Sequence, residues 1–193
     1  MRRCLIAITL AVLVGSLPAA GNSPAERAAL SAYLEQALSS PGSFEDRFEA
    51  EVWLMDMQAR LTPFEPSVEA RIDLLRQIHH QASRTGVSPE LVLALIEVES
   101  RFDRFAVSKA GAQGLMQVMP FWKTELGRAE DNLTDIQTNL RYGCAILKFY
   151  LEREQGALHP ALAAYNGSSE SRRYSNKVFE AWAQRWRTEP LDW

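Results

Sequence analysis

The sequence contains only two cysteines, no Lys/Arg cluster longer than a pair, and one long uncharged apolar run. Its 21 Lys and Arg residues against 24 Asp and Glu residues give a net charge of -3. This balance argues against nucleic acid as a partner, because neutralising phosphates requires clustered cations. Hydrophobic residues make up 47% of the 193 residues, which excludes a mostly disordered chain and indicates one domain with a small extension.

The apolar run lies at the N-terminus and predicts an export signal. Arg2 and Arg3 precede the run from Cys4 to Leu17, and small residues follow up to Gly21. This is the layout of a secretory signal peptide, so we expect residues 1–20 to be removed. A retained anchor is the alternative, although the run is shorter than the ~20 residues that a membrane-spanning helix needs.

Loss of the signal peptide would leave a single cysteine, Cys144, and a net charge of -5, because Arg2 and Arg3 are lost with it. An internal disulfide is then excluded. Cys144 shares a helical stripe with Leu140 and Leu147, so we expect a buried and unreactive thiol.

Helical periodicity dominates the rest of the chain and no period-2 strand pattern is found, which predicts an all-α fold. Start signals include Ser88 before Pro89, and Asp135 with the preceding threonine. Glycines such as Gly127 mark helix ends. The expected helices are 23–38, 44–61, 66–83, 89–101, 115–126, 135–154, 160–166 and 175–187.

These helices divide into an N-terminal extension at residues 21–70 and a main domain at residues 71–193. The extension carries no group of residues to which we can assign chemistry. One interpretation is a helical collar packed on the main domain, in which Trp53, Met55 and Met57 would be buried. The other is an arm that docks a partner of the cell envelope.

Glu99 is the first candidate catalytic residue. On a helix it shares a stripe with Val92, Leu95 and Phe102, so its carboxyl lies on an apolar face. Apolar surroundings disfavour the anion, raise the pKa and let a carboxyl act as a general acid near neutral pH. The alternative from periodicity alone is a solvent-facing or structural carboxyl. Its neighbour Glu97 faces another way and is expected to pair with an arginine four residues later, at the surface.

The sequence does not present the residue patterns expected of a metal site, a nucleophilic triad or a phosphate-binding loop. His79 and His80 are adjacent and face different directions, and His159 stands alone, so no metal site is expected. No histidine is placed for a nucleophilic triad. Gly111 and Gly114 frame a tight loop that leads into the predicted helix with Gln117, but the Gly-Lys-Ser/Thr ending of a phosphate-binding loop is missing.

Three motifs occur in order along the chain. They are Glu99-Ser100, then the stretch 106–120 with the sequence Ala-Val-Ser and Gly-Ala-Gln-Gly-Leu-Met-Gln-Val-Met-Pro, and Ala-Ala-Tyr-Asn-Gly at 163–167. This set resembles the soluble, goose-lysozyme-like lytic transglycosylases, which carry an SLT domain. The resemblance covers roughly residues 78–167, with weaker similarity to residue 186.

The resemblance implies an α-helical, lysozyme-like fold that cleaves peptidoglycan glycan strands without water. Glu99 would protonate the MurNAc-GlcNAc glycosidic oxygen and then accept the proton of the C6 hydroxyl, giving a 1,6-anhydromuramoyl end. The substrate's acetamido group would stabilise the oxocarbenium-like state. Ordinary glycosidases instead need a second carboxylate about 5 to 9.5 Å away, and Asp103 is the candidate for that role.

The same resemblance assigns the substrate site. Ser108 and Gln117 would line the sugar cleft, Met116 would abut it, and Asn166 would contact substrate or brace its loop. The Tyr165 hydroxyl would lie near the catalytic carboxyl and hydrogen-bond it. A buried tyrosine with one unrelated hydrogen bond is the alternative for Tyr165. Residues 168–173 depart from the family pattern as a polar insert, expected as a solvated loop or a cleft wall.

We therefore expect an exported lytic transglycosylase, periplasmic or associated with the bacterial cell envelope. It would act as a monomer on peptidoglycan, with no cofactor and no metal. The alternatives are a goose-type lysozyme-like hydrolase, which would leave reducing ends, and a peptidoglycan-binding protein that does not cleave.

Overall fold

The computed structural model describes residues 47–167 and 172–188. This part of the chain is helical, and its β-type pairing is limited to isolated bridges at residues 107–118. The prediction of an all-α fold is confirmed for these residues. None of the helices described there is both long and apolar enough to cross a membrane. The predicted signal peptide and the helix expected at 23–38 lie outside the described residues.

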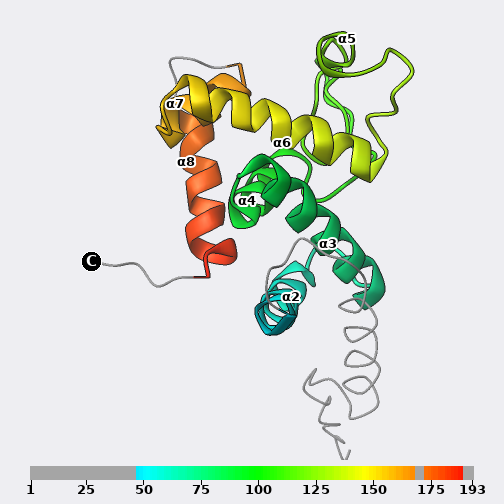
Figure 1. Cartoon of the computed structure of the whole chain (residues 1–193), viewed down its shortest axis with the longest axis vertical. Coiled ribbons are helices and arrows are strands. Elements are labelled where there is room, and N and C mark those ends of the chain that lie inside the picture. Colours follow the sequence, from blue (N-terminus) through cyan, green and yellow to red (C-terminus); the bar gives the residue numbers. More distant parts are fainter. Residues whose placement is uncertain (1–46, 168–171, 189–193) are drawn as a thin grey trace, which may run out of the picture.

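The helices follow one another along the chain as shown in Figure 1. They are α2 (Arg47–Leu61), α3 (Val68–Thr85), α4 (Pro89–Glu99), α5 (Trp122–Leu126), α6 (Ile136–Arg153), α7 (Leu158–Tyr165), α8 (Arg172–Ala181) and a final π-helical turn, η1 (Trp182–Trp186).

The short helix α4 lies at the centre of the structure. Every residue from Leu91 to Ile96 is buried, which is the pattern of a helix covered on all sides. The cover comes from α3, α8 and η1, which all pack against α4. The long helix α6 crosses the molecule and packs against α3 and α7, while α8 runs beside α4 (Figure 1). The candidate catalytic Glu99 is therefore the last residue of the most buried helix.

Capping side chains set the starts of three helices close to the predicted positions. Ser67 and Ser88 accept hydrogen bonds from the backbone two or three residues into α3 and α4, and Asp135 does the same for α6. α3 ends where Gly86 takes a left-handed conformation, with φ of 66°. The expected helix at 115–126 is wrong over its first part, because only Trp122–Leu126 is helical.

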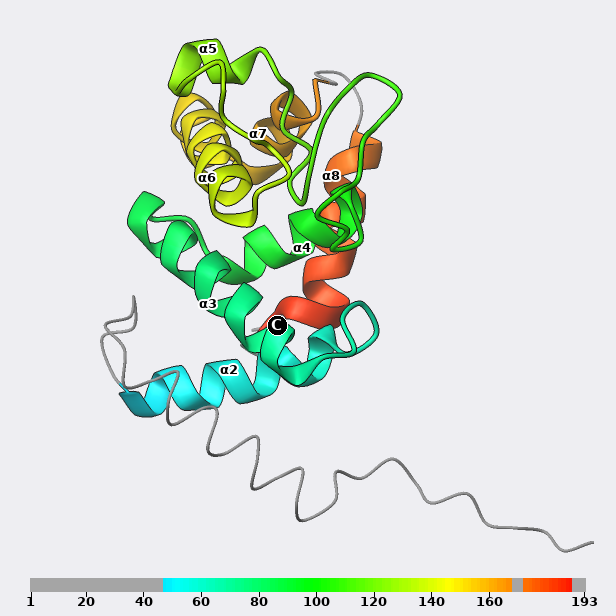
Figure 2. The same cartoon turned by 90° about the vertical axis from the view of Figure 1, so that its right-hand side faces the viewer.

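The described part of the N-terminal extension packs on the main body. α2 contacts α3 and η1 and lies across the end of α3 (Figure 2). Trp53 Nε1 donates to Glu90 Oε1 at 2.7 Å, which ties α2 to the start of α4. Met57 is buried, as the collar interpretation requires, but the expectation for Met55 is wrong because its side chain is 47% exposed.

Candidate active site

Glu99 lies at the point where α4 gives way to a tightly turned segment. The next residue, Ser100, caps the helix, and its hydroxyl donates to the Leu115 carbonyl at 2.8 Å. Arg101 and Phe102 follow with φ of 52° and 66°, in the left-handed region that non-glycine residues rarely occupy. Such strain is concentrated at functional sites, so this turn marks the end of α4 as a candidate site.

The Glu99 carboxyl is held in surroundings that favour its neutral form. Burial raises its pKa from about 4.5 to about 7, while a hydrogen bond from Tyr174 opposes part of that rise. The Tyr174 hydroxyl donates to Glu99 Oε1 at 2.5 Å. The structure therefore supports the sequence-based expectation that an apolar setting raises the pKa of this carboxyl.

The tyrosine that contacts Glu99 is not the one that the resemblance implied. The Tyr165 hydroxyl donates instead to the Met116 carbonyl at 2.7 Å, so the expected hydrogen bond to Glu99 is wrong. Both tyrosines still lie close enough to feel the carboxylate. Burial and the negative charge of Glu99 raise the pKa of Tyr165 and of Tyr174 well above the ordinary value, so both hydroxyls keep their protons.

Tyr174 could have been found from the sequence if the last helix had been started earlier. The predicted helix began at residue 175, whereas α8 begins at Arg172. Within α8, Tyr174 and Val178 are four residues apart and lie on the same buried face. Of the polar insert predicted at 168–173, Arg172 and Arg173 are helical and belong to α8. The rest of the insert, 168–171, lies outside the described residues.

The partners of Glu97 also differ from the predicted one. Its Oε2 accepts a hydrogen bond from Trp186 Nε1 at 2.7 Å and forms an ion pair with Arg185 Nε at 3.2 Å. The predicted partner, Arg101, lies over the Phe64 ring instead. Glu97 is thus a structural carboxyl that joins α4 to η1 rather than a solvated surface group.

The second motif lies on a loop at residues 106–118, which we call the braced loop because internal hydrogen bonds hold it. Gln113 pairs in antiparallel bridges with Val107 and with Val118. Gln117 has φ of 48°, and its side-chain amide donates to the carbonyls of Ala106 and Gly114 at 3.1 and 3.0 Å. This left-handed residue and the bridge to Val118 are incompatible with the helix that we expected from Leu115.

The predicted site residue Ser108 closes the same loop. Its hydroxyl accepts from the Ala112 N–H at 3.0 Å, and its own N–H donates to the Ala112 carbonyl at 2.9 Å. The Ser108 residue is exposed, as is Asn166, which caps the end of α7 next to Tyr165. Ser108, Gln117 and Asn166 therefore remain proposals as substrate contacts, and each has a structural role as well for the backbone around it.

Asn139 anchors this loop to α6. Its buried side chain accepts from Met116 N–H and donates to the carbonyls of Gln113 and Leu133, all at 2.8 Å. Gly114 sits against it, because a Cβ there would lie 2.4 Å from Asn139 Nδ2. The glycine is thus required by contact with α6.

The Met116 side chain is packed against α6. It is completely buried, and a Cβ on Gly143 of α6 would lie 2.3 Å from its sulfur. A position of Met116 beside the sugar therefore stays a prediction, for a side chain that is buried against α6. Met116 also contributes through its backbone, since its N–H bonds Asn139 and its carbonyl accepts from Tyr165.

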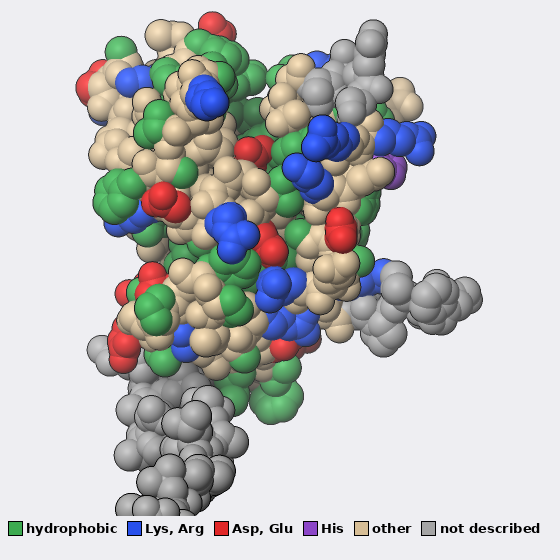
Figure 3. Space-filling view, turned by 180° about the vertical axis from the view of Figure 1, so that it is seen from behind, with side chains coloured by type: hydrophobic (Ala, Val, Ile, Leu, Met, Phe, Trp, Pro, Cys, Tyr) green, Lys and Arg blue, Asp and Glu red, His purple; other side chains and the backbone are tan. Residues whose placement is uncertain are grey.

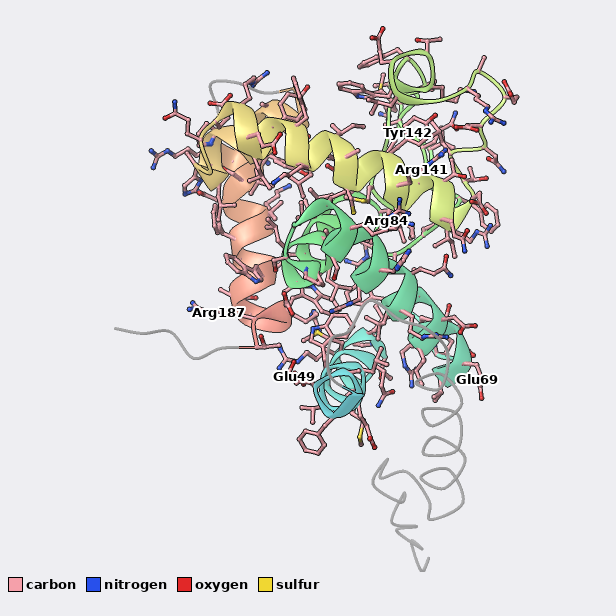
Figure 4. The ribbon with its side chains drawn as sticks, in the orientation of Figure 1. Glu49, Glu69, Arg84, Arg141, Tyr142 and Arg187 are labelled. Carbon is pink, nitrogen blue, oxygen red and sulfur yellow. The ribbon has the colours of Figure 1, made fainter. Side chains whose placement is uncertain are left out.

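The segment between α5 and α6 is fixed from the same helix. Tyr142 and Arg141, labelled in Figure 4, both reach Oδ2 of Asp131, at 2.6 and 2.9 Å. Gly127 leaves room for this arrangement, because a Cβ there would collide with the Tyr142 hydroxyl. α6 therefore positions both the loop at 106–118 and the segment that follows α5.

The remaining titratable groups do not form a metal site within the described part of the chain, where no cluster of three or more His, Cys, Asp or Glu residues is placed to hold an ion. His159 Nδ1 lies 2.9 Å from the Ser175 hydroxyl and its ring contacts Phe179, linking α7 to α8. Cys144 is buried, and burial raises the pKa of its thiol to about 12, which agrees with an unreactive cysteine.

Comparison with known proteins identifies relatives over the same region. A membrane-bound lytic murein transglycosylase C from Actinobacillus pleuropneumoniae is 51% identical over 43 residues, covering 22% of this chain and 12% of that protein. A transglycosylase of Enterobacteria phage PRD1 is 32% identical over 97 residues, covering 50% of this chain and 36% of that one. The chain thus spans about a third or less of the length of these relatives.

The solved structure of an inactive mutant of the lytic transglycosylase Slt from Pseudomonas aeruginosa aligns over 55% of this chain and 19% of its own, with 27% identity and a TM-score of 0.44. The profile of the transglycosylase SLT domain matches residues 76–185, a span that includes Glu99, the braced loop, Tyr165 and Tyr174. More than half of the sequence lies within that match. The chain belongs to the transglycosylase SLT domain family.

Proposed function

We propose that this protein is a lytic transglycosylase that cleaves the glycan strands of peptidoglycan without consuming water. The observation that carries the proposal is the half-buried carboxyl of Glu99, which accepts a hydrogen bond from Tyr174 and whose pKa, raised to about 7, suits a group that must first donate and then accept a proton. The names of the relatives support the substrate, because they describe murein transglycosylases. Family membership supports the reaction class.

In the proposed reaction, protonated Glu99 gives its proton to the glycosidic oxygen between MurNAc and GlcNAc, and the bond from that oxygen to the muramoyl C1 breaks. The resulting Glu99 carboxylate takes the proton of the muramoyl C6 hydroxyl. The C6 oxygen then bonds C1 and closes the 1,6-anhydro ring, so the proton returns to Glu99 and no water is used.

Tyr174 fits both steps. Its hydroxyl hydrogen bond stabilises the Glu99 carboxylate that exists between them, and it holds one carboxyl oxygen so that the other faces the substrate. The pKa of Tyr174 is raised well above the ordinary value, so this donor keeps its proton at every working pH. We assign Tyr174 as the residue that orients the catalytic carboxyl.

We assign Asp103, the candidate second carboxylate, a structural role. Its Oδ1 accepts from the Phe105 N–H at 2.8 Å, which fixes the turn after Glu99. Burial and the Tyr174 hydrogen bond account for the shifted pKa of Glu99, with no neighbouring carboxylate involved. This supports the lytic reaction over the hydrolytic alternative, which needs a base or nucleophile facing the same bond.

The test is digestion of purified sacculi by the wild type, Glu99→Gln and a matched control, Glu152→Gln. Glu152 is an exposed carboxyl on α6 that pairs only with Lys148 across one helical turn. We expect Glu99→Gln to lose roughly 10²- to 10⁴-fold in rate, since one residue serves as acid and base. Glu152→Gln should match the wild type, and equal losses in the two variants would contradict the assignment.

We further propose that the protein is exported and acts at the cell envelope. Residues 1–20 have the layout of a signal peptide, and one relative is named as membrane-bound. Cell fractionation of the full chain and of a variant lacking residues 2–20 tests this. Retention of both forms in the cytoplasm would contradict export.

A further inference from the structure

The segments around Glu99 differ in charge from the rest of the chain. Residues 100–118 and α8 together carry six Lys and Arg residues and two acids, a net charge of +4. Because the whole chain carries -3, all other residues together carry -7. The two acids are occupied locally, since Asp103 bonds the Phe105 N–H and Glu180 accepts from Gln184. The positive charge is therefore concentrated on the elements that build the site.

Lys and Arg side chains lie along a hollow in the molecular surface. Seen from behind, the surface is hollowed between the part of the molecule that carries α5 and the part that carries α8. Lys and Arg side chains gather along this hollow (Figure 3). On α8, Lys177 follows Tyr174 by three residues, and Arg173 lies four residues before Lys177. Helical spacing therefore places both on the side of α8 that borders the tyrosine bound to Glu99.

The loop after Glu99 carries a further cation, a guanidinium that lies over an aromatic ring. The Arg104 guanidinium carbon lies 4.8 Å from the centre of the Phe105 ring. Arg104 Nε is buried and has no hydrogen-bond partner among the residues that the structure describes. Phe105 is 66% exposed although its N–H and the neighbouring Ala106 carbonyl are fixed by hydrogen bonds.

We propose that a basic rim, defined as Arg104, Arg173 and Lys177, binds the carboxylates of the peptide stems that hang from the glycan strand. This inference rests on the proposed function and names the form of substrate that the site prefers. The sugars of the strand are uncharged, and in intact peptidoglycan the lactyl carboxyl is tied up in the amide bond to the stem. The carboxylates of the stems are thus the anions that a cationic rim can recognise.

The rim predicts a preference for strands that retain their stems. Stripping the stems with an amidase frees one lactyl carboxylate on each muramic acid, close to the sugar, and removes the more distant carboxylates. Neutral chitin oligosaccharides have neither kind. These three ligands separate recognition of stem carboxylates from recognition of the lactyl group and of the sugar backbone.

The experiment measures binding by Glu99→Gln, so that no ligand is consumed, with and without the further changes Arg104→Gln and Lys177→Gln. We expect the added pair of changes to weaken binding of stem-bearing strands by about three- to tenfold, because each removes a partly exposed charge pair. Higher salt should weaken the same interaction. Binding of stripped strands and of chitin oligosaccharides should change less than twofold, a bound that we set from the weakness of surface charge effects.

The matched control replaces Arg84 and Arg128 with Gln, since both are exposed arginines outside the rim, Arg84 on α3 and Arg128 after α5. The control should bind all three ligands as Glu99→Gln alone does. Equal weakening for stripped and stem-bearing strands would assign the rim to the lactyl group and overturn the proposal, as would binding that is unaffected by the rim changes. Absence of cleavage by the wild type on any strand would count against the proposed function separately, because the binding data need no catalysis.

Discussion

Replacement of Glu99 by Gln tests the buried carboxyl through stability as well as activity. Burial raises the pKa of Glu99 from about 4.5 to about 7, so the folded state binds this proton more tightly than the unfolded state does. Folding stability therefore falls as the pH rises between these two values, and the full cost is present above about pH 7. Gln carries no charge at any pH, so the variant escapes this cost.

The size of the effect follows from the pKa change. A carboxyl whose pKa moves from about 4.5 to about 7 loses roughly 3 kcal/mol on ionisation in the folded state, as an upper value. The Gln carbonyl can still accept the hydrogen bond from Tyr174, so the packing and that contact are kept. We expect Glu99→Gln to be more stable than the wild type by about 2 to 3 kcal/mol near pH 8, and equal to it near pH 4.

The assay is urea denaturation of both proteins across this pH range, with Glu152→Gln as the control. Glu152 is an exposed side chain, 66% accessible, so its change should leave stability within about 0.5 kcal/mol at each pH. A Glu99→Gln protein that is no more stable than the wild type near pH 8 would refute the buried carboxyl. So would a gain in stability of the same size near pH 4.

The other predictions concern the groups that hold Glu99 and its loop. Tyr174→Phe should slow cleavage by about ten- to a hundredfold, because it removes a charge-assisted hydrogen bond worth roughly 1.5 to 3 kcal/mol. Tyr165→Phe should change the melting temperature more than the cleavage rate. If Tyr165→Phe slowed cleavage more than Tyr174→Phe did, Tyr165 would be restored as the partner of Glu99. The cleavage rate should fall above about pH 7 as Glu99 loses its proton, and a rate still rising past about pH 8 would contradict this. Asn139→Ala should cost at least about 3 kcal/mol in urea denaturation, because three buried backbone groups lose their partner, and a loss below about 1 kcal/mol would contradict the anchoring role. Cys144 should resist alkylation in the native protein and react only after unfolding, as mass spectrometry would show.

Local sequence patterns were sufficient for most of the described helices, although not for the segment 115–121, and for the apolar setting of Glu99. The stripe shared by Val92, Leu95 and Glu99 depends only on helical spacing, and the structure places Glu99 at the end of a buried helix as that spacing indicates. Capping residues such as Ser88 and Asp135 act on backbone groups three residues away, so their effect can be predicted from sequence.

The parts that sequence could not predict depend on contacts between distant residues. Gln117 leaves the helical region because the surrounding loop is fixed by Asn139, which lies more than twenty residues later on another helix. Met116 is buried because Gly143 of the same helix leaves room for its sulfur. Which tyrosine reaches Glu99 depends on how α8 packs against α4, and neither helical spacing nor a family motif specifies that packing.

The central claim is that one carboxyl performs both proton transfers and that water does not enter the product. Its most direct test is digestion of purified peptidoglycan by the wild type in water enriched in heavy oxygen, followed by mass spectrometry of the muramic acid ends. We predict 1,6-anhydromuramoyl ends, lighter than reducing ends by one water and free of heavy oxygen. Reducing ends that carry heavy oxygen would contradict it, and would identify a hydrolase with a second catalytic group.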